Sequence, residues 1–456
     1  MATINLDTPL LDGGISSINF FNGRLLSGQD LDQEQAANHA GRRQLGKALG
    51  GGIVYGLEVE PSPGQGDSVA VKVYAGLAFN RKGEAVYLPE DSVVSLQAAT
   101  PQVAPQAGLF EECLSRTTGS GGLRANSGLY LLLIAPTSGY QGRAQTSGLA
   151  ESPATGFACG SGYKVEGVRF SLVPLIFDPA IPLEGVSSDT LQSLNTLSQS
   201  NAPEDISKLR NWLAHLFFGT EARQQGAEGL GGKFAKKNLY RPAYAHDTLY
   251  RLAGLNDCEV PLALLYWLPG GLEYIDLGAV RRRPLPPGLG DWWPLPNSTG
   301  YPALGEACLL QFQEQLADLF APKFSPGVLN ALQATNYFRY LPAAGIIPLS
   351  PLTPTSAGRG INYLNFFQGL ACHSPLYIQA AQVEALLQES LAYPPVDLEG
   401  EVMFWLYLVR QEGQTNLNNL PPYMLFASGA LPARGEARYN QARWNFSYYS
   451  QGVSLA

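Results

Sequence analysis

The sequence predicts an α+β fold, rich in β-structure, that is divided into several domains. Its 456 residues exceed what one hydrophobic core usually supports, so two or three domains are expected. The 50 Gly and 33 Pro residues make up about 18% of the chain, against roughly 12% on average, which indicates many turns and long Gly/Pro/Ser-rich loops. Short apolar, β-branched segments recur between these loops and favour antiparallel β domains with isolated helices.

The first predicted domain, residues 1–178, is a β domain with one helix. Ser27 is a suitable N-cap and Asp30 lies in the first turn, so a polar, Ala-rich helix is expected over residues 29–49. Its apolar stripe is thin, which indicates a helix that lies on a surface or in an assembly. Strands are expected at 53–59, 69–73, 77–80, 85–88, 93–96, 129–135 and 165–176, with loops at 97–128 and 136–162. The strands on either side of residues 81–84 read as a hairpin.

The second predicted domain, residues 179–347, mixes helices and strands. Its first residues belong to a linker-like segment at 177–200. Helices are expected where apolar residues recur at steps of three and four, at 205–218 and 306–319. A hairpin is expected from strands at 261–267 and 272–280, followed by a Pro/Gly/Trp loop at 284–302.

The third predicted domain, residues 348–456, begins with a Pro/Ser/Thr-rich linker at 348–359. Ser374 followed by Pro375 is typical of an N-cap and first helical position, so a helix is expected from there to Leu391. Strands at 402–410 and 424–427 and an aromatic tail at 443–449 complete the chain.

Charge and composition limit the partners that the protein can have. The net charge of −8 argues against nucleic acid, which requires a basic face. The one basic run, Arg281-Arg282-Arg283, is interpreted as a solvated strand end. Only 15% of residues are charged, against roughly 25% usually, and aromatic residues are plentiful. Weakly charged, aromatic surfaces often contact partner proteins, although an ordinary β-rich protein with many loops has the same composition.

The cysteines predict neither a disulfide framework nor a zinc site. Their number is odd and no two have the CxxC spacing, so reduced, mostly buried thiols are expected at positions 113, 159, 258, 308 and 372. The N-terminus lacks a charged-then-apolar signal segment, and the longest apolar runs have the length of strands. Synthesis in the cytoplasm, without a membrane span, is therefore expected.

Motifs for nucleotide, metal or nucleophile chemistry are weak. Residues 41–48 have the Gly-x4-Gly-Lys spacing of a phosphate loop, but Ala48 replaces the hydroxyl that would bind magnesium, and the motif lies inside a predicted helix. The four histidines show no ligand spacing; they are His39, His215, His246 and His373. His246 precedes Asp247, and His373 follows Cys372, but adjacency in sequence alone makes neither a metal site nor a catalytic dyad. No cofactor is expected.

Two enzyme-like or ligand-binding interpretations remain open. Carboxylates cluster at Glu111-Glu112 and at Glu399-Gly400-Glu401. These read as solvated loop charges, yet a hydrolase pair of glycosidase type on separate strands would leave no sequence signature. The segments Trp292-Trp293 and Tyr448-Tyr449 could stack on sugars of a cell surface, or could anchor another protein.

The most distinctive feature is a phrase that occurs twice, each time as two Phe residues shortly before a Gly. Asn-Phe-Phe-Asn-Gly stands at residues 19–23 and Asn-Phe-Phe-Gln-Gly at residues 365–369. The Phe rings are expected to be buried at a backbone corner, where Gly permits positive φ. The candidate structural or interface residues are Asn19, Phe20, Phe21, Gly23, Arg24, Asn365, Phe366, Phe367 and Gly369. None of these can act as an acid, base or nucleophile.

The run from Asn19 to Leu31, Asn-Phe-Phe-Asn-Gly-Arg-Leu-Leu-Ser-Gly-Gln-Asp-Leu, resembles the "NFFNGRLL" proteins, whose genes accompany bacterial contractile injection systems of the phage-tail-like kind. In that family a polar helix and then a Gly-rich V-x-GLEV segment follow, which residues 53–59 match. The segment 71–78 is also similar, with Ala75 where the family often has Pro and Asn80 where it often has an acid. Further family-like phrases stand at 338–345, 406–410 and 423–428, so the resemblance covers about two-thirds of the chain.

The resemblance implies a non-enzymatic structural component at or near the baseplate of such a particle. It would act through contacts with baseplate, sheath or fibre proteins, in several copies per particle, without nucleic acid and without a membrane span of its own. The particle would be assembled in the cytoplasm and then released or held at a membrane by other components. The alternatives are a glycan-binding module for target recognition and a hydrolase.

Overall fold

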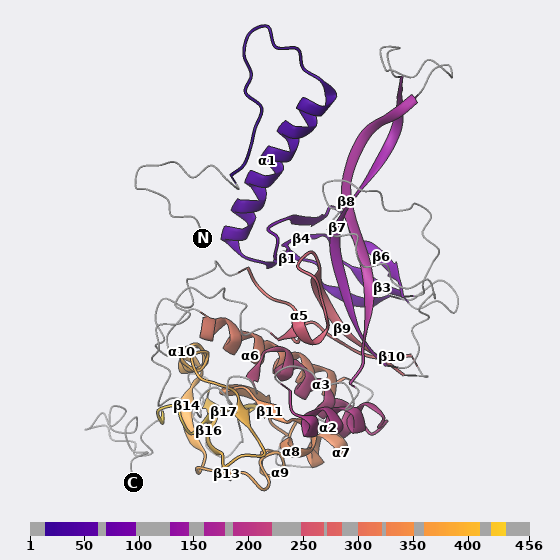
Figure 1. Ribbon diagram of the computed structural model, residues 1–456. Coiled ribbons are helices and arrows are strands. Elements are labelled where there is room, and N and C mark those ends of the chain that lie inside the picture. Colours follow the sequence, from indigo (N-terminus) through magenta and orange to yellow (C-terminus); the bar gives the residue numbers. More distant parts are fainter. Residues whose placement is uncertain are drawn as a thin grey trace, which may run out of the picture.

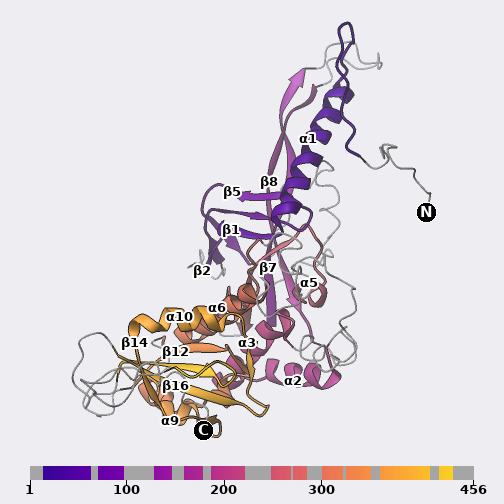
Figure 2. The ribbon, with the colours of Figure 1, turned by 90° about the vertical axis from the view of Figure 1, so that its left-hand side faces the viewer.

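The computed structural model describes residues 14–62, 70–96, 128–145, 159–177, 186–220, 248–268, 271–284, 300–321, 325–350, 360–410 and 421–434. These residues form several, mostly antiparallel sheets with helices packed beside them, so the chain is α+β and β-rich as predicted. The first helix, α1 (Gly28–Leu49), and a long two-stranded ribbon project from one end of the molecule, while the C-terminal sheet lies at the opposite end (Figures 1 and 2).

A four-stranded antiparallel sheet occupies the centre. Its strand order is β10-β9-β7-β8, with bounds β7 (Gly128–Gln145), β8 (Cys159–Leu175), β9 (Val260–Leu268) and β10 (Gly271–Asp276). Successive side chains of a strand point to opposite faces, and residues 129–135 of β7 are apolar on both. Leu129, Leu131 and Leu133 pack on one face, and Tyr130, Leu132 and Ile134 on the other. The predictions of a buried strand at 129–135 and of a hairpin around residues 269–271 are confirmed.

Two small sheets cover the second of these faces. One has the order β1-β4-β5 and the other β2-β3-β6, with bounds β1 (Gly52–Gly56), β2 (Val59–Ser62), β3 (Ala70–Val73), β4 (Gly76–Phe79), β5 (Ala85–Leu88) and β6 (Ser92–Ser95). The predicted hairpin at 77–88 is confirmed. The single strand expected at 53–59 is wrong, because the chain turns at Gly56 and Leu57, which both have positive φ, and passes from one sheet to the other.

Arg281 stabilises that turn. Its two terminal nitrogens donate to the carbonyls of Gly56, at 2.6 Å, and Leu57, at 2.9 Å. The interpretation of residues 281–283 as a solvated run therefore holds only for Arg283, whose side chain is exposed and paired with Glu306 at 2.8 Å.

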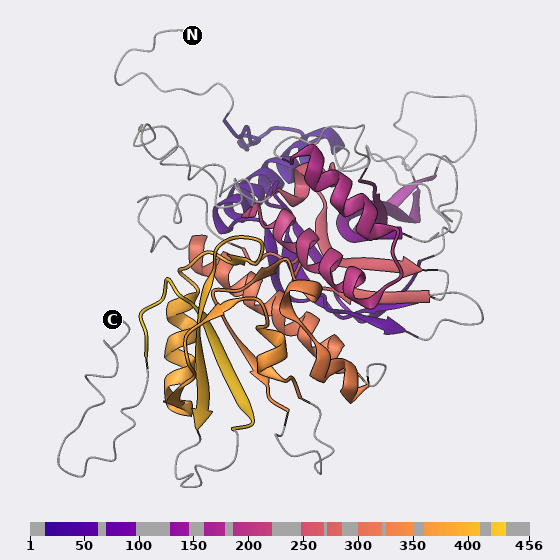
Figure 3. The same cartoon turned by 90° about the horizontal axis from the view of Figure 1, so that it is seen from below.

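Helices cover the other face of the central sheet (Figure 3). They are α2 (Ser188–Ser198), α3 (Pro203–Phe217), the short α5 (Leu249–Leu252) and α6 (Gly300–Leu319). The predicted helices at 205–218 and 306–319 are confirmed. The predicted linker at 177–200 is wrong at α2, which is capped by Ser187 and buries Leu191 and Leu194 in the core shared with α3. This burial outweighs a local sequence that has little helical signal of its own.

The C-terminal part is a mixed sheet between two layers of helices. Its main order is β12-β17-β16-β13, and β14 also pairs with β16. Helix α10 packs on one face, and α6 with two short helices packs on the other. The bounds are β11 (Tyr340–Leu341), β12 (Ala344–Pro348), β13 (Ala371–Cys372), β14 (Leu376–Gln379), β15 (Val396–Asp397), β16 (Met403–Arg410), β17 (Tyr423–Ser428), α7 (Pro326–Ala331), α8 (Ala334–Tyr337), α9 (Tyr363–Phe366) and α10 (Ala380–Ser390). The strands predicted at 402–410 and 424–427 are confirmed.

The helix start predicted at Ser374-Pro375 is wrong. Residues 376–379 form β14, which pairs in parallel with β16, and Ile378 is fully buried there. The helix begins at Ala380 instead, with Gln379 as its N-cap. Pairing with a buried strand satisfies the backbone and buries apolar area at once, which outweighs a local capping signal.

The loop expected at 136–162 is also wrong in part. β7 continues to Gln145 and β8 begins at Cys159, and the two strands pair along this whole projecting ribbon. The loop predicted at 97–128 lies outside the described residues except for Gly128, and so do the aromatic tail at 443–449, most of the linker at 348–359 and most of the loop at 284–302.

Strand pairing joins the segments on either side of both predicted domain boundaries. β7, which precedes position 178, pairs with β9, which follows it. β12 spans position 347 and pairs with β17. The three predicted domains, 1–178, 179–347 and 348–456, thus share sheets and cores.

Among the cysteines with described side chains, the expectation of a reduced thiol fails at Cys258. Cys258 is disulfide-bonded, whereas Cys308 and Cys372 are free thiols. Among the described residues, no helix combines the length and apolarity that crossing a membrane requires.

Candidate protein-binding surface

Helix α1 begins as the sequence predicts. The Ser27 hydroxyl accepts a hydrogen bond from the Asp30 backbone N–H at 3.1 Å, and the Asp30 carboxylate accepts from the Ser27 N–H at 2.8 Å. This reciprocal capping satisfies two helix-end donors. The Ser27 hydrogen bonds, followed by Arg24, hold the pKa of Asp30 below its ordinary value. Gly50 ends the helix with positive φ.

The helix is attached to the body near its C-terminal end. Gly46 is the buried residue of α1, and a Cβ there would overlap the carbonyl of Gly83 in the β4–β5 hairpin. Next to this contact, Arg43 Nε lies 3.6 Å from Glu84 Oε1. Beyond this point α1 extends away from the two small sheets, toward the end at which the β7–β8 ribbon also projects (Figures 1 and 2).

The first phrase forms a turn that folds back along α1. The Arg24 N–H donates to the Phe21 carbonyl at 3.2 Å, and Gly23 has a φ of +91°. The Arg24 guanidinium donates to the Asn19 carbonyl at 2.8 Å and to Asp30 of the helix at 2.7 Å. The predicted residues Asn19, Gly23 and Arg24 are therefore brought together, and Arg24 fixes the turn to the helix.

The expectation that the first Phe pair is buried is wrong. Phe20 is 53% exposed and Phe21 is 63% exposed, and the following Leu25 and Leu26 are exposed as well. The physical reason is that this segment lies against one projecting, mostly polar helix instead of against a β domain, so no core is within reach.

The second phrase is buried, as predicted. Phe366 is fully buried and Phe367 is 5% exposed, in an aromatic cluster with Phe338, Phe404 and Phe426, at ring distances of 5.6 to 6.2 Å. Asn365 donates to the Asn330 carbonyl at 2.8 Å, and Gly369 has a φ of +84°. The two phrases lie at opposite ends of the molecule (Figure 1). The first phrase precedes α1, and the second begins in α9.

Exposed apolar side chains are concentrated near α1. Among the described residues, 21 large apolar side chains are exposed, and eight of them lie within residues 14–49, which we call the N-terminal arm. They are Ile15, Phe20, Phe21, Leu25, Leu26, Leu31, Leu45 and Leu49. A cluster of exposed aromatic and aliphatic side chains is typical of a surface that binds another protein. The sequence signal that points to this surface is the thin apolar stripe of α1, which offers the preceding segment little apolar area to pack against.

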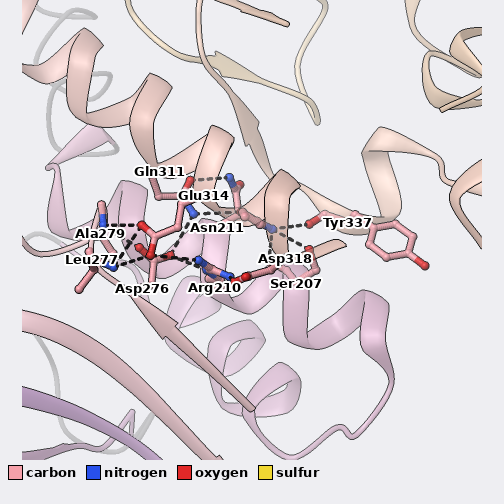
Figure 4. A network of polar contacts seen from close by, with 12 residues as sticks. Ser207, Arg210, Asn211, Asp276, Leu277, Ala279, Gln311, Glu314, Asp318 and Tyr337 are labelled. Carbon is pink, nitrogen blue, oxygen red and sulfur yellow. Dashed lines mark hydrogen bonds and ion pairs between the residues drawn. The ribbon is translucent and has the colours of Figure 1, made fainter. Parts of the chain in front are cut away.

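A second group of chemically active residues is a buried polar network between the central sheet, α3 and α6 (Figure 4). Arg210 of α3 donates to Asp276 at the end of β10 at 2.6 Å and to Asp318 of α6 at 2.5 Å, and its guanidinium lies 3.7 Å from Glu314. Asp276 also accepts from the Ala279 N–H at 2.8 Å. Further amide contacts come from Asn211, Gln311 and Gln315.

The network places one cation, Arg210, among three carboxylates. Burial lowers the pKa of Arg210, but Asp276, Glu314 and Asp318 together raise it above the ordinary value, so the guanidinium stays charged. The Glu314 carboxylate accepts from the backbone N–H groups of Leu277, at 2.9 Å, and Gly278, at 2.8 Å. These contacts join α3 to the end of β10 in the central sheet and to α6. The charged groups contact one another within the protein, which is typical of a network with a structural role. Sequence periodicity could have indicated it, since Arg210 interrupts the apolar face of α3.

Glu314 makes stability depend on pH. Burial, and then the Asp276 charge, raises its pKa to about 7, against the opposing effect of Arg210. Between pH 4.5 and 7 the folded chain keeps a proton that the unfolded chain loses, so this group lowers the free energy of unfolding as pH rises, by on the order of 3 kcal/mol. We expect the free energy of unfolding, measured with urea, to decrease less between pH 4.5 and 7 in Glu314→Gln than in the wild type. Equal decreases in both proteins would contradict this role.

The remaining candidates do not combine into a catalytic site within the described residues. His215 is buried, which lowers its pKa to about 3, and its ring packs 4.7 Å from Tyr340. His373 stacks on Trp405 at 3.6 Å, and burial raises the pKa of Cys372 to about 11, which disfavours a thiolate nucleophile. In the carboxylate cluster at residues 399–401, Glu399 contacts Arg339 and lies 3.9 Å from Lys208, so it belongs to ion pairs.

Other predicted features lie in α1 or outside the described residues. The phosphate-loop-like segment 41–48 is inside α1, whose backbone N–H groups already donate within the helix, and His39 is a half-buried residue of the same helix. Glu111-Glu112, His246-Asp247, Trp292-Trp293 and Tyr448-Tyr449 lie outside the described residues. In the described part of the chain, no three His, Cys, Asp or Glu side chains are grouped to hold a metal ion.

Comparison with protein-family models and with curated proteins gave no match for this chain.

Proposed function

We propose that this chain is a non-enzymatic building block of a phage-tail-like contractile injection particle, at or near its baseplate. It would act by binding another protein of the particle through the turn at residues 19–26. The resemblance of residues 19–31 to the NFFNGRLL proteins suggests the kind of particle. The observation that carries the proposal is the exposure of four large apolar side chains in this one turn: Phe20, Phe21, Leu25 and Leu26.

The geometry of the turn suits docking. Arg24 ties its backbone to Asp30 of a capped helix, so the shape of the turn is set before a partner arrives. Preorganisation lowers the entropy cost of binding, and buried Phe side chains are effective anchors in interfaces. The helix carries the turn to the end of the molecule where the β7–β8 ribbon also projects, away from the two small sheets and the other helices (Figure 2).

The test is incorporation into particles. In the double variant Phe20→Ser/Phe21→Ser we expect at least about tenfold less of the chain in isolated particles, because each lost anchor costs more than about 1 kcal/mol of binding. Quantitative immunoblotting of purified particles measures this, and thermal unfolding should be unchanged because both rings are exposed.

The matched control is Tyr87→Ser/Val93→Ser, which removes two exposed apolar side chains from β5 and β6. It should enter particles normally. Absence of the wild-type chain from isolated particles would contradict the proposed function, and equal incorporation of both double variants would contradict the role of the turn.

A further inference from the structure

Three residues on one face of α1 recur at intervals of seven positions. Leu31, Asn38 and Leu45 are seven positions apart, and Leu49 lies one turn after Leu45. This spacing places all four on one side of the helix, as at the contact positions of a coiled coil. The three leucines are 53%, 70% and 52% exposed, so this face, which we call the leucine face, has no partner within the described chain.

The charges of α1 are divided between its two halves. The first half carries Asp30, Asp32 and Glu34, and the second half carries Arg42, Arg43 and Lys47. A rotation of 180° about an axis through Asn38, perpendicular to the helix, exchanges position 34 with 42 and position 31 with 45. The leucine face is therefore complementary to a second copy of itself in the antiparallel direction, in charge as well as in apolar contact.

We infer that two copies of this chain pair through their α1 helices, antiparallel, about a two-fold axis near Asn38. Leu31 of one copy packs over Leu45 and Leu49 of the other, and Glu34 of each copy faces Arg42 of the other. The two Asn38 side chains meet at the centre, where a polar residue among apolar contacts sets the register. The opposed helix dipoles also favour this direction.

The attachment of α1 leaves room for such a pair. The helix is held near its C-terminal end, by Gly46 on the β4–β5 hairpin, and Arg43 turns toward Glu84 of that hairpin. Its 22 residues span about 33 Å, so an antiparallel pair keeps the two bodies at opposite ends. A parallel pair would bring both bodies to the same end and would stack acidic half on acidic half, at a cost in repulsion.

This inference goes beyond the proposed function, because it concerns contact between two copies, made by a different set of side chains from the turn. The test is the mass of the purified full chain in sedimentation equilibrium over a series of concentrations. We expect a dimer for the wild type and at least a hundredfold weaker association for Leu45→Asp. The control Leu364→Asp, an exposed leucine at the far end of the molecule, should dimerise like the wild type.

Two further experiments test the direction of the pair and its charge contacts. A mixture of Leu31→Cys and Leu45→Cys should form a disulfide between copies, whereas Leu31→Cys alone should not, because its two copies would lie about 21 Å apart along the pair. Glu34→Arg and Arg42→Glu should each weaken the dimer, and the double variant should restore it.

A monomer at every concentration, a dimer unaffected by Leu45→Asp, or cross-linking of Leu31→Cys to itself would overturn the inference. Binding of the leucine face to another particle protein, without dimers, would also overturn it. The outcome is distinguishable from failure of the proposed function, since a dimer that is absent from particles contradicts only the latter.

Discussion

Phe366→Ala is expected to lower the free energy of unfolding by about 3–5 kcal/mol. Phe366 is fully buried and lies 4.9 Å from the Phe367 ring and 6.2 Å from the Phe338 ring, centroid to centroid. Removing the ring loses its transfer free energy and leaves a cavity, because the aromatic cluster is held by a helix layer and a sheet that cannot both move inward. Urea unfolding followed by far-ultraviolet circular dichroism measures the change.

The chain contains its own control for this experiment. Phe20 has the same neighbours in sequence, Asn before it and Phe after it, but it is 53% exposed. Phe20→Ala should therefore change the free energy of unfolding by less than about 0.5 kcal/mol. A similar loss in both variants would show that the first phrase is buried in the protein in solution, contrary to the structure.

Arg210→Met is expected to cost about 3–5 kcal/mol of folding stability. The substitution keeps much of the side-chain volume but leaves the Asp276 carboxylate, which is fully buried, without its cation. An unpaired buried charge is expensive because the interior solvates it poorly. Urea unfolding at neutral pH measures the loss, and the lower stability should recover in part at acid pH, where carboxylates take up protons.

The control here is an ion pair of the surface. Lys72 lies 2.8 Å from Asp91, and both side chains are largely in contact with solvent. Lys72→Met should lower the free energy of unfolding far less than Arg210→Met does, because exposed ion pairs contribute little to stability. In the network itself, adding Asp276→Asn to Arg210→Met should recover at least about 1 kcal/mol, because the double variant no longer holds the fully buried charge of Asp276. If the double variant lost as much stability as the two single variants lose together, Arg210 and Asp276 would not interact.

Several elements could be read from the sequence because their signals are local. The reciprocal cap of Ser27 and Asp30 starts α1 where the residues predict it, and the apolar spacing of α3 gives its length. The β4–β5 and β9–β10 hairpins follow from short strands around turn residues. Each of these depends on residues close in the chain, so neighbours in sequence carry the information.

Other elements depend on distant partners. Residues 376–379 follow a good helix-start signal, yet they form β14, because β16, 31 residues further on, offers a buried edge to pair with. The polar ribbon of β7 and β8 has the composition of loops, and its strands persist because each satisfies the backbone of the other. The network of Arg210 joins groups that are 66 and 108 residues apart in the chain, which no local pattern specifies.

By itself the sequence determined the α+β, β-rich class, the capped helix α1 and the corner geometry of both Phe-Phe phrases, including positive φ at Gly23 and Gly369. Only the tertiary structure decided which phrase is core and which is surface. Burial depends on which distant segments of the chain pack beside a residue. Two nearly identical short sequences therefore do not determine whether their side chains are buried. α6, β16 and β17 enclose Phe366 and Phe367, whereas a projecting helix leaves Phe20 and Phe21 in contact with solvent.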